Sequence, residues 1–400
     1  MRHSLRHLGG VVHCVAVACC LAVGHSAVSA ATVRWNGADG TWDFAAGEWL
    51  NGASFVNGDT AVFNGIETPN RGRTNLITVD ANGVSPAAVQ SDGGFSATFN
   101  FTGGDILTGS VTTGTSNNLL FSRDGSYSFG GGLTSGSLIT YQPALTTANQ
   151  TLQLGTGTIT TAGFYFFPAQ AGTKLNNTIN LTGSGSTNFW SSANADWSAT
   201  TVNVTGANPI NLGEATISGG TPMVYNNLTM TLLNNAQFKM NTRAQTGSVP
   251  PAFTGVVNGA HTLTTDVASG YQGYSIIGGN GNWGIAGLTK TGTGVLRLNA
   301  PEVVGDVLRI NAGKVFVGTG RTQTVTELWL GGVQQTVQGT YGATGSGATF
   351  VNDTYFGTTT GFTGVIVVVP EPATLALAGL GLGLVSFALR RRIASASRRG

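Results

Sequence analysis

Side chains that could do chemistry are few in this sequence, and most lie close to its beginning. The histidines are His3, His7, His13, His25 and His261, and the cysteines are Cys14, Cys19 and Cys20. A serine–histidine triad, a thiolate nucleophile, or a zinc site with several histidines or cysteines needs such residues in one place. Beyond Ala30 only His261 remains, so we expect no such site, no metal and no cofactor.

The acidic residues also give little support for catalysis. Cleavage of a polysaccharide needs two carboxylates across one sugar bond, or carboxylates with lysine or arginine on neighbouring turns. Asp196, Glu214 and Asp266 are scattered singly along the chain. We therefore expect a protein that is not an enzyme, although a polysaccharide lyase or glycosidase stays open as an alternative.

Charge is sparse and unevenly distributed. Between residues 31 and 389 there are 12 lysines and arginines against 17 aspartates and glutamates. The remaining seven arginines, which turn the net charge to +2, are Arg2, Arg6, Arg390, Arg391, Arg392, Arg398 and Arg399. Binding to a phosphate backbone requires a basic stripe, which the body of the chain lacks. Nucleic acid is therefore not an expected partner.

The segment from Met1 to Ala30 has the three parts of a secretory signal peptide. Arg2 and Arg6 precede an apolar core at about residues 11–23, and small residues follow, with Val28 and Ala30 before the expected cut. The core is too short to span a bilayer of about 30 Å. We expect a signal peptidase to cleave after Ala30, with Ala31 as the second choice, and the protein to be exported through the inner membrane.

The exported part has the pattern of an all-β protein. Segments such as TLQLGTGTITT (Thr151–Thr161), NTINLTG (Asn177–Gly183) and TVNVTG (Thr201–Gly206) alternate apolar residues with threonine or asparagine. Glycine, asparagine and serine separate them, and no helical period occurs between Ala31 and Val369. Alternation with a period of two, interrupted by turn residues, is typical of short strands.

Two all-β layouts are compatible with this pattern, a series of β-sandwiches and a β-solenoid. No linker, charge run or proline-rich break divides residues 31–369 into separate sandwiches. We therefore expect one right-handed β-helix or solenoid-like body with about 20–25 residues per turn. Aliphatic side chains would stack inside this body, and threonine, asparagine and serine would face water.

One segment of the body, residues 287–317, resembles the autotransporter-associated β-strand repeat, a unit of secreted bacterial β-helices. The match comprises GLTKTG (Gly287–Gly292), VLRL (Val295–Leu298) and LRINAG (Leu308–Gly313). Alternation places Leu308, Ile310 and Ala312 inside and Val307, Arg309 and Asn311 outside. Gly313 should turn the chain before Val315 and Val317 return to the interior.

The two flanks resemble, more loosely, the modules that open and close proteins with these repeats. The opening module covers residues 35–65 and contains Trp35, Trp42 and Trp49, and the closing module covers residues 328–369. The three indoles either cap the open end of the solenoid core, which we favour, or form an exposed platform on which sugars stack. Asp39, Asp43 and Asp59 of the same module are expected to stabilise turns.

The C-terminal segment Pro370–Gly400 combines three features in one short stretch. Pro370-Glu371-Pro372 is followed by an uncharged span, Ala373–Leu389, and by Arg390, Arg391 and Arg392. The span could form a short membrane helix of about 25 Å, with the arginines on the cytoplasmic side. An anchor does not need the tripeptide, however, and the three parts together resemble the PEP-CTERM sorting signal. This resemblance implies that an exosortase reads Pro370, Glu371 and Pro372 while the helix holds the chain transiently in the inner membrane.

Together with the signal peptide, the resemblance to the PEP-CTERM signal implies an exported protein of the cell surface or extracellular matrix of a Gram-negative bacterium that makes exopolysaccharide. We expect a structural or adhesive role in the exopolysaccharide layer, with extracellular polysaccharide as the partner. The alternative is a β-helix protein that binds or cleaves carbohydrate.

Overall fold

The computed structural model describes most of the chain between residues 30 and 369. The described ranges are 30–35, 39–45, 48–64, 74–92, 97–103, 106–114, 117–122, 127–143, 145–182, 187–192, 194–212, 224–240, 252–267, 274–278 and 283–369. The expected signal peptide before Ala30, Glu214, and the sorting segment 370–400 with its expected membrane helix lie outside these ranges.

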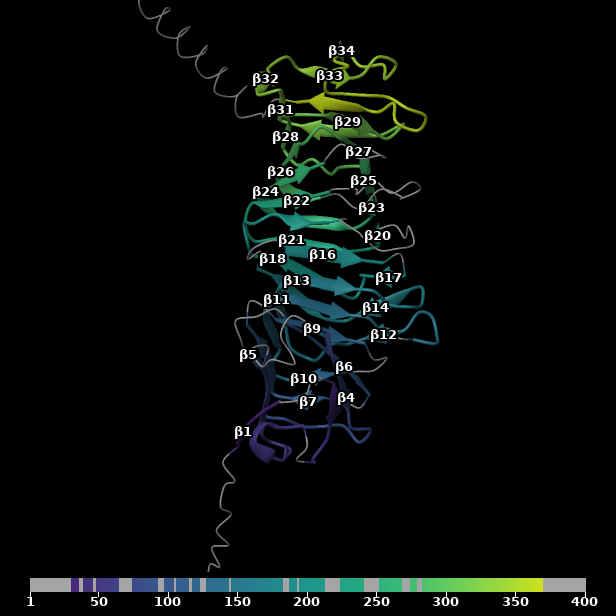
Figure 1. Cartoon of the computed structure of the whole chain (residues 1–400). Helices are drawn as coiled ribbons and strands as arrows, with labels where there is room; N and C mark the ends of the chain where they lie inside the picture. The colour runs from purple at the N-terminus through teal and green to yellow at the C-terminus, as the bar shows by residue number, and fades with distance from the viewer. Residues whose placement is uncertain are drawn as a thin grey trace, which may run out of the picture.

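The described residues form a β-solenoid in which the chain winds along three faces and stacks each strand on the equivalent strand of the previous turn (Figure 1). Every named strand pair from β1 to β31 is parallel. The alternation of apolar and polar residues fits these strands, because each strand buries one row of side chains inside the solenoid and exposes the other. The structure thus confirms the solenoid and excludes separate sandwiches.

The strands are grouped here by face. Face 1 holds β1 (Thr32–Arg34), β3 (Thr60–Asn64), β5 (Ala88–Asp92), β8 (Ser110–Thr113), the first parts of β11 (Leu133–Tyr141) and β13 (Ile159–Phe166), β15 (Thr178–Leu181), β18 (Thr201–Val204), β21 (Thr229–Leu232), and the first parts of β24 (Val256–Asp266) and β26 (Gly284–Thr291). Face 2 holds β2 (Gly40–Trp42), β4 (Thr74–Val79), β6 (Ala97–Gly103), β9 (Asn117–Phe121), β16 (Thr187–Ser191), β19 (Ile210–Asn211), β22 (Ala236–Lys239), the second parts of β11, β13, β24 and β26, and then β28 (Val307–Ile310) and β31 (Glu327–Leu330). Face 3 holds β7 (Leu107–Thr108), β10 (Ser128–Phe129), β12 (Thr151–Leu152), β14 (Thr173–Leu175), β17 (Ala195–Asp196), β20 (Val224–Tyr225), β23 (Ala252–Phe253), β25 (Tyr274–Gly278), β27 (Val295–Asn299) and β29 (Lys314–Val317).

One aliphatic ladder runs along the interior of face 1 from β1 to β24. Its members, each paired with the next, are Val33, Ala61, Val89, Val111, Leu133, Ile159, Ile179, Val202, Met230 and Val257, and all are buried. Burying a side chain such as Ile159 or Val202 stabilises the fold by about 1.5–3 kcal/mol. The repeated ladder therefore stabilises the stacking of turns along face 1.

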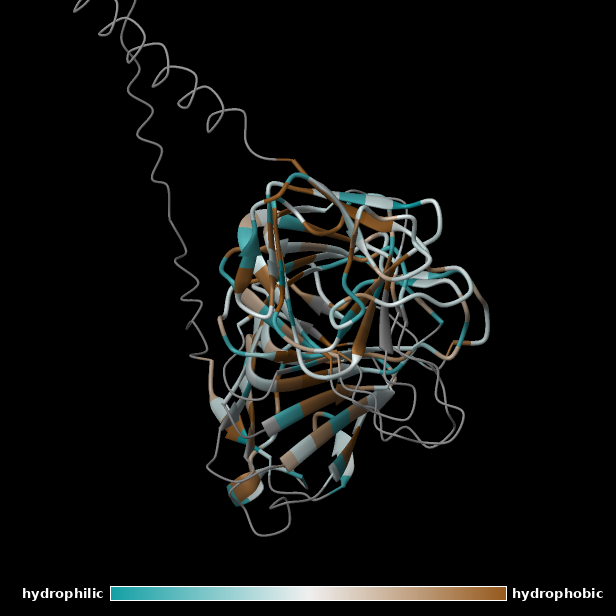
Figure 2. Cartoon of the chain, turned by 90° about the horizontal axis from the view of Figure 1, so that it is seen from above, coloured by the Kyte–Doolittle hydropathy of each residue, from teal (hydrophilic) through white to brown (hydrophobic). Residues whose placement is uncertain are grey.

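The outer side of face 1 carries a matching column of uncharged polar side chains. Its members are Gln90, Thr112, Thr134, Thr160, Asn180, Asn203, Thr231 and Asn258, again each paired with the next. Neighbouring amides in this column are joined, since Asn203 Nδ2 donates to Asn180 Oδ1 at 2.9 Å. The view along the long axis shows the resulting alternation of hydrophobic and hydrophilic residues (Figure 2).

Turn lengths vary more than the sequence pattern predicts. Leu288 pairs with Leu308, and Leu308 pairs with Leu328, so these turns are short and equal in length. Near the other end Thr32 pairs with Thr60, so that turn contains more residues. The extra residues lie in the corners and leave the parallel register unchanged. The described residues between about 66 and 270 continue the same solenoid.

The segment 287–317 has the predicted inward and outward assignment, with one exception. Leu308 and Ile310 are buried, while Val307 and Arg309 are partly exposed. Ala312 is half-buried and not in the core, because the corner begins at this point and Gly313 takes a φ of 67°. Val315 and Val317 return to the interior as expected. The membership of this segment in the named repeat class stays a prediction.

The two ends of the solenoid differ from its middle. At the N-terminal end a single 3-10 turn, η1 (Leu50–Gly52), lies beside a cluster of aromatic rings. At the other end the pairing changes direction, because β32 (Val333–Gln335) folds back on β31 as an antiparallel strand. β33 (Gly339–Gly342), β34 (Phe350–Val351) and β35 (Val365–Val368) then form a small sheet with β30 (Thr322–Val325). This sheet closes the end of the rod.

Candidate functional site

The three tryptophans of the opening segment lie inside the N-terminal end of the solenoid. Trp35, Trp42 and Trp49 are 0 %, 0 % and 2 % exposed. The rings of Trp35 and Trp49 meet edge to face at 5.3 Å, and Trp42 packs in the same way on Phe63 at 5.1 Å. Buried rings cannot stack on a sugar, so the structure overturns the interpretation of an exposed platform. Their position is the one that an end cap requires.

The aspartates near these tryptophans hold turns together. Asp59 is buried, and its two carboxylate oxygens accept hydrogen bonds from the backbone N–H groups of Ala31 (2.9 Å) and Val56 (3.0 Å). Asp43 Oδ1 accepts from Ala45 N at 2.8 Å, and Asp39 Oδ1 accepts from Leu76 N at 2.8 Å. Each aspartate thus stabilises the backbone of a corner through its side chain.

Two of the acidic residues considered for catalysis, Asp196 and Asp266, lie on different faces. Asp196 ends β17 on face 3, whereas Asp266 ends β24 on face 2. Asp196 Oδ2 lies 3.7 Å from Lys174 Nζ. Burial raises the pKa of Asp196, but hydrogen bonds from Ser198 and Asn227 outweigh it and keep the pKa below its usual value. A carboxylate held in this way serves as a charge partner and is poorly suited to donate a proton.

Lys290 is a buried cation within the segment that resembles the repeat. It is 0 % exposed, and its Nζ donates to the carbonyl oxygens of Thr291 (2.5 Å), Gly292 (2.6 Å) and Ala312 (3.1 Å). Burial lowers the pKa of Lys290 to about 8, and the nearby Asp266 opposes this change. Because all three ammonium protons are used by backbone carbonyls of two adjacent turns, the side chain acts as a clamp between turns.

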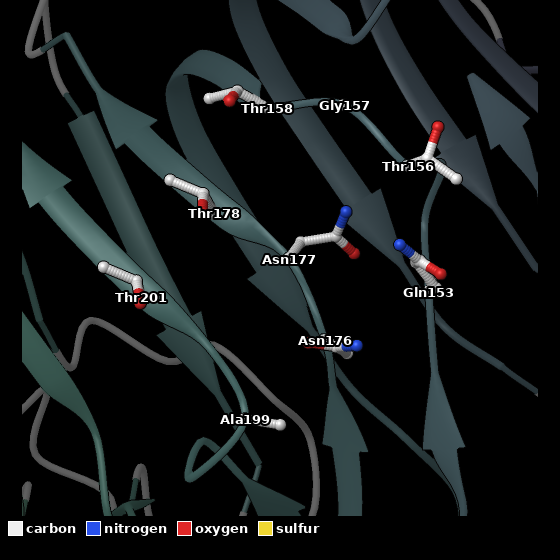
Figure 3. A pocket seen from close by; sticks show the side chains of 9 residues that line it. All are labelled: Gln153, Thr156, Gly157, Thr158, Asn176, Asn177, Thr178, Ala199 and Thr201. Carbon is white, nitrogen blue, oxygen red and sulfur yellow. The ribbon is translucent and has the colours of Figure 1, made fainter. Parts of the chain in front are cut away.

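A polar groove of about 350 Å³ lies at the corners between face 3 and face 1 (Figure 3). It is lined by Gln153, Thr156, Gly157, Thr158, Asn176, Asn177, Thr178, Ala199 and Thr201, which come from three consecutive turns. None of these residues is charged or aromatic. Most belong to segments in which apolar and polar residues alternate. This alternation predicts strands, but it does not indicate a binding site. Only the stacking of corners brings them together.

Two outward-facing aromatic rings on face 2 were also not predicted as a pair. Tyr165 and Trp190 occupy paired positions on β13 and β16, and their rings stack at 4.3 Å with an angle of 5°. Both are half-buried, and Asn188 Nδ2 donates to the Tyr165 hydroxyl at 3.0 Å. The alternation in FYFF (164–167) could have indicated that Tyr165 points outward. Each ring covers a face of the other, so the pair stabilises the sheet.

The solenoid ends immediately before the predicted sorting segment. Strand β35 lies between β30 and β33, and Val369 N donates to Val325 O at 2.8 Å. The chain is thus held against the closing sheet up to the residue before Pro370. Among the residues that the structure describes, no helix reaches the length and apolar character that a membrane crossing needs.

Comparison with known proteins identifies this C-terminal segment. Residues 368–392 match the family model described as the PEP-CTERM protein-sorting motif. No curated protein and no solved structure matches the chain. The fold and the motif together define a β-solenoid with a C-terminal sorting signal. Such a signal implies a protein that an exosortase sorts to the cell surface.

Proposed function

We propose that this protein is a structural or adhesive component of the exopolysaccharide layer of a Gram-negative bacterium. In this proposal, a signal peptidase removes the segment Met1–Ala30, and an exosortase recognises Pro370, Glu371 and Pro372. The span Ala373–Leu389 holds the chain in the inner membrane until sorting is complete. Arg390, Arg391 and Arg392 keep the end of the chain on the cytoplasmic side.

The observation that carries the proposal is the column of uncharged polar side chains from Gln90 to Asn258 on the outer side of face 1, on a rod that ends at a sorting motif. Hydroxyl and amide groups such as those of Thr134, Asn180 and Asn203 both donate and accept hydrogen bonds, as sugar hydroxyls do. A rod whose inner ladder is continuous and whose ends are closed can span a hydrated matrix without pairing through its strand edges. These properties suit a scaffold within a glycan layer.

Carbohydrate binding is the second candidate function, and the polar groove that includes Gln153, Thr178 and Thr201 favours it. Cleavage is less well supported, because Asp196 and Asp266 lie on different faces and cannot act across one sugar bond. We propose that the protein is not an enzyme and needs no cofactor.

The test uses the exported protein purified from its native host. The protein is incubated with the exopolysaccharide of that host and with a panel of other polysaccharides, and both reducing ends and electrophoretic retardation are measured. We expect the protein to co-fractionate with the host exopolysaccharide and to release no reducing ends. Release of reducing ends would establish an enzyme, and absence from the exopolysaccharide fraction would contradict the proposed location.

A further inference from the structure

The polar groove between face 3 and face 1 has the properties of a ligand site, because most of its side chains are not used by the fold. Six of them form no side-chain hydrogen bond with any described residue: Gln153, Thr156, Thr158, Asn176, Thr178 and Thr201. The two hydroxyls of Thr178 and Thr201 come from directly paired positions. The groove therefore presents a set of donors and acceptors that only water or a ligand can satisfy.

The floor of the groove is held by neighbouring residues that are fully engaged. The buried Asn177 accepts a hydrogen bond from Leu154 N at 2.8 Å, and its amide donates to Leu154 O at 3.2 Å and Gly155 O at 3.0 Å. In the next turn the buried Thr200 also bonds to the previous turn, since its hydroxyl donates to Leu175 O. Each corner is thus bonded to the corner of the previous turn, so the free side chains stand on a rigid base.

The free groups repeat along the axis of the rod. Thr158, Thr178 and Thr201 project side by side from successive turns (Figure 3). Strands in such a stack are about 4.8 Å apart. Gln153 and Asn176 add amide groups on the other side of the groove. A ligand that lies along this groove would meet the same kind of group at each step, which suits a chain of similar units.

The composition of the lining selects the chemical class of that chain. Hydroxyls and primary amides can both donate and accept, which matches the hydroxyls of a sugar. An anionic glycan would need a cation beside it to offset the loss of water from its carboxylates, and none of the nine lining residues is a lysine or an arginine. We propose that this groove binds a short segment of an uncharged glycan. This inference rests on the proposed function, because it names the groove as the place where the protein contacts the surrounding polysaccharide.

The test compares two triple variants of the exported protein that change the same residue types. The groove variant is Gln153→Ala with Thr178→Val and Thr201→Val. The control variant is Gln334→Ala with Thr74→Val and Thr78→Val, whose side chains are exposed on β32 and β4 and lie outside both the groove and the outer column of face 1. Because all six positions face solvent or the groove, both variants should keep the far-UV circular dichroism spectrum and melting temperature of the unchanged protein.

Binding is measured by titration calorimetry with cellohexaose, laminarihexaose and maltohexaose as uncharged glycans and with hexagalacturonic acid as an anionic one. We expect the unchanged protein and the control variant to bind at least one uncharged hexasaccharide, and the groove variant to bind it at least tenfold more weakly. Equal binding by the two variants would overturn the assignment to the groove. Tighter binding of hexagalacturonic acid than of every uncharged glycan would overturn the ligand class.

The two levels of the proposal can fail separately. If no uncharged hexasaccharide binds, but the protein still co-fractionates with the host exopolysaccharide, the groove proposal is wrong and the proposed function stands. If the protein also separates from the exopolysaccharide, the proposed function fails together with it.

Discussion

The backbone nitrogen of Ala31 lies 2.9 Å from Oδ1 of Asp59, a carboxylate that is only 6 % exposed. Ala31 is also the residue that becomes the N-terminus if a signal peptidase cleaves after Ala30. Cleavage would therefore turn this N–H donor into an ammonium group beside a buried carboxylate. A backbone bond from Thr60 N to Ala31 O at 2.8 Å holds the residue in place.

We expect Asp59→Asn to lower the free energy of unfolding of the mature protein by about 1.5–3 kcal/mol, the range for hydrogen bonds to charged groups. The control is Asp43→Asn, whose carboxylate accepts one hydrogen bond in an exposed turn and should change stability by less than about 1 kcal/mol. Denaturant titration gives both values, and mass spectrometry gives the N-terminus. A mature chain that begins at a residue other than Ala31, or equal effects of the two variants, would contradict the prediction.

Lys290 should make stability depend on pH in the alkaline range. Its pKa is lowered to about 8 in the folded protein, from an ordinary value of 10.5. Between these values the unfolded chain binds more protons, so the free energy of unfolding rises with pH. From pH 7 to pH 10 this contribution amounts to about 2 kcal/mol. At neutral pH the ammonium is charged in both states, and its burial reduces stability.

The measurement compares the unchanged protein with Lys290→Met. The variant should be less stable at pH 10 by about 1–3 kcal/mol, because the neutral amine of Lys290 still donates two N–H groups to the surrounding carbonyls and methionine donates none. At pH 7 the difference should be smaller or reversed, since the variant also removes a buried charge. A stability difference that does not change between pH 7 and pH 10 would refute this account of Lys290.

Leu308 and Arg309 are neighbours that should respond very differently to substitution. Leu308 is fully buried between Leu288 and Leu328, so Leu308→Asp places an unpaired charge in the ladder and should cost more than about 3 kcal/mol. Arg309 Nη2 lies 3.6 Å from Glu327 Oε2 on the outer side, where an ion pair contributes at most about 1 kcal/mol. Arg309→Gln is the suitable control, because Arg309→Asp would place two carboxylates together. Equal loss of stability in denaturant titrations would contradict the inward and outward assignment.

The aromatic cap should protect the N-terminal turns without affecting the rest of the rod. Trp42 packs on Phe55 at 5.4 Å and on Phe63 at 5.1 Å, so Trp42→Ala should cost about 3–5 kcal/mol. In a solenoid each turn contacts only its neighbours, and we expect hydrogen exchange to accelerate in β1–β6 but not in β26–β29. Trp190→Ala, at a half-buried outer position, serves as the control. Uniform loss of protection along the rod would show that the ring cluster is not a local cap.

The sorting motif gives a prediction that concerns processing and not folding. Because the structure holds the chain at Val369 through the bond to Val325 O, the motif begins directly after the last strand of the closing sheet. We expect Pro370→Ala with Pro372→Ala to leave export intact, to leave the C-terminal tail attached, and to reduce the amount of protein at the surface. The mass of the mature C-terminus in the native host distinguishes the outcomes. A tail that extends to Gly400 in the unchanged surface protein would support a lasting anchor instead.

Much of the fold could be predicted because a solenoid repeats a local rule. The alternation in TLQLGTGTITT and TVNVTG already indicates strands that bury one side, and the absence of linkers favours one continuous body. The inward position of Leu308 and the turn at Gly313 follow from the same alternation. The burial of Trp35, Trp42 and Trp49 did not follow, since residue type alone leaves both a cap and an exposed platform open.

The sequence by itself determined the strand period, the exclusion of thiol and multi-histidine sites beyond Ala30, and the sorting motif, because each depends on residue types within a short stretch. Only the tertiary structure decided which residues meet between turns. Gln153, Asn176 and Thr201 lie in separate segments, and corners of unequal length set the register that brings them into one groove. The same holds for Lys290 and Ala312, whose contact exists only because one short turn stacks on the next. Contacts of this kind depend on the length of each turn, which the local alternation of apolar and polar residues does not encode.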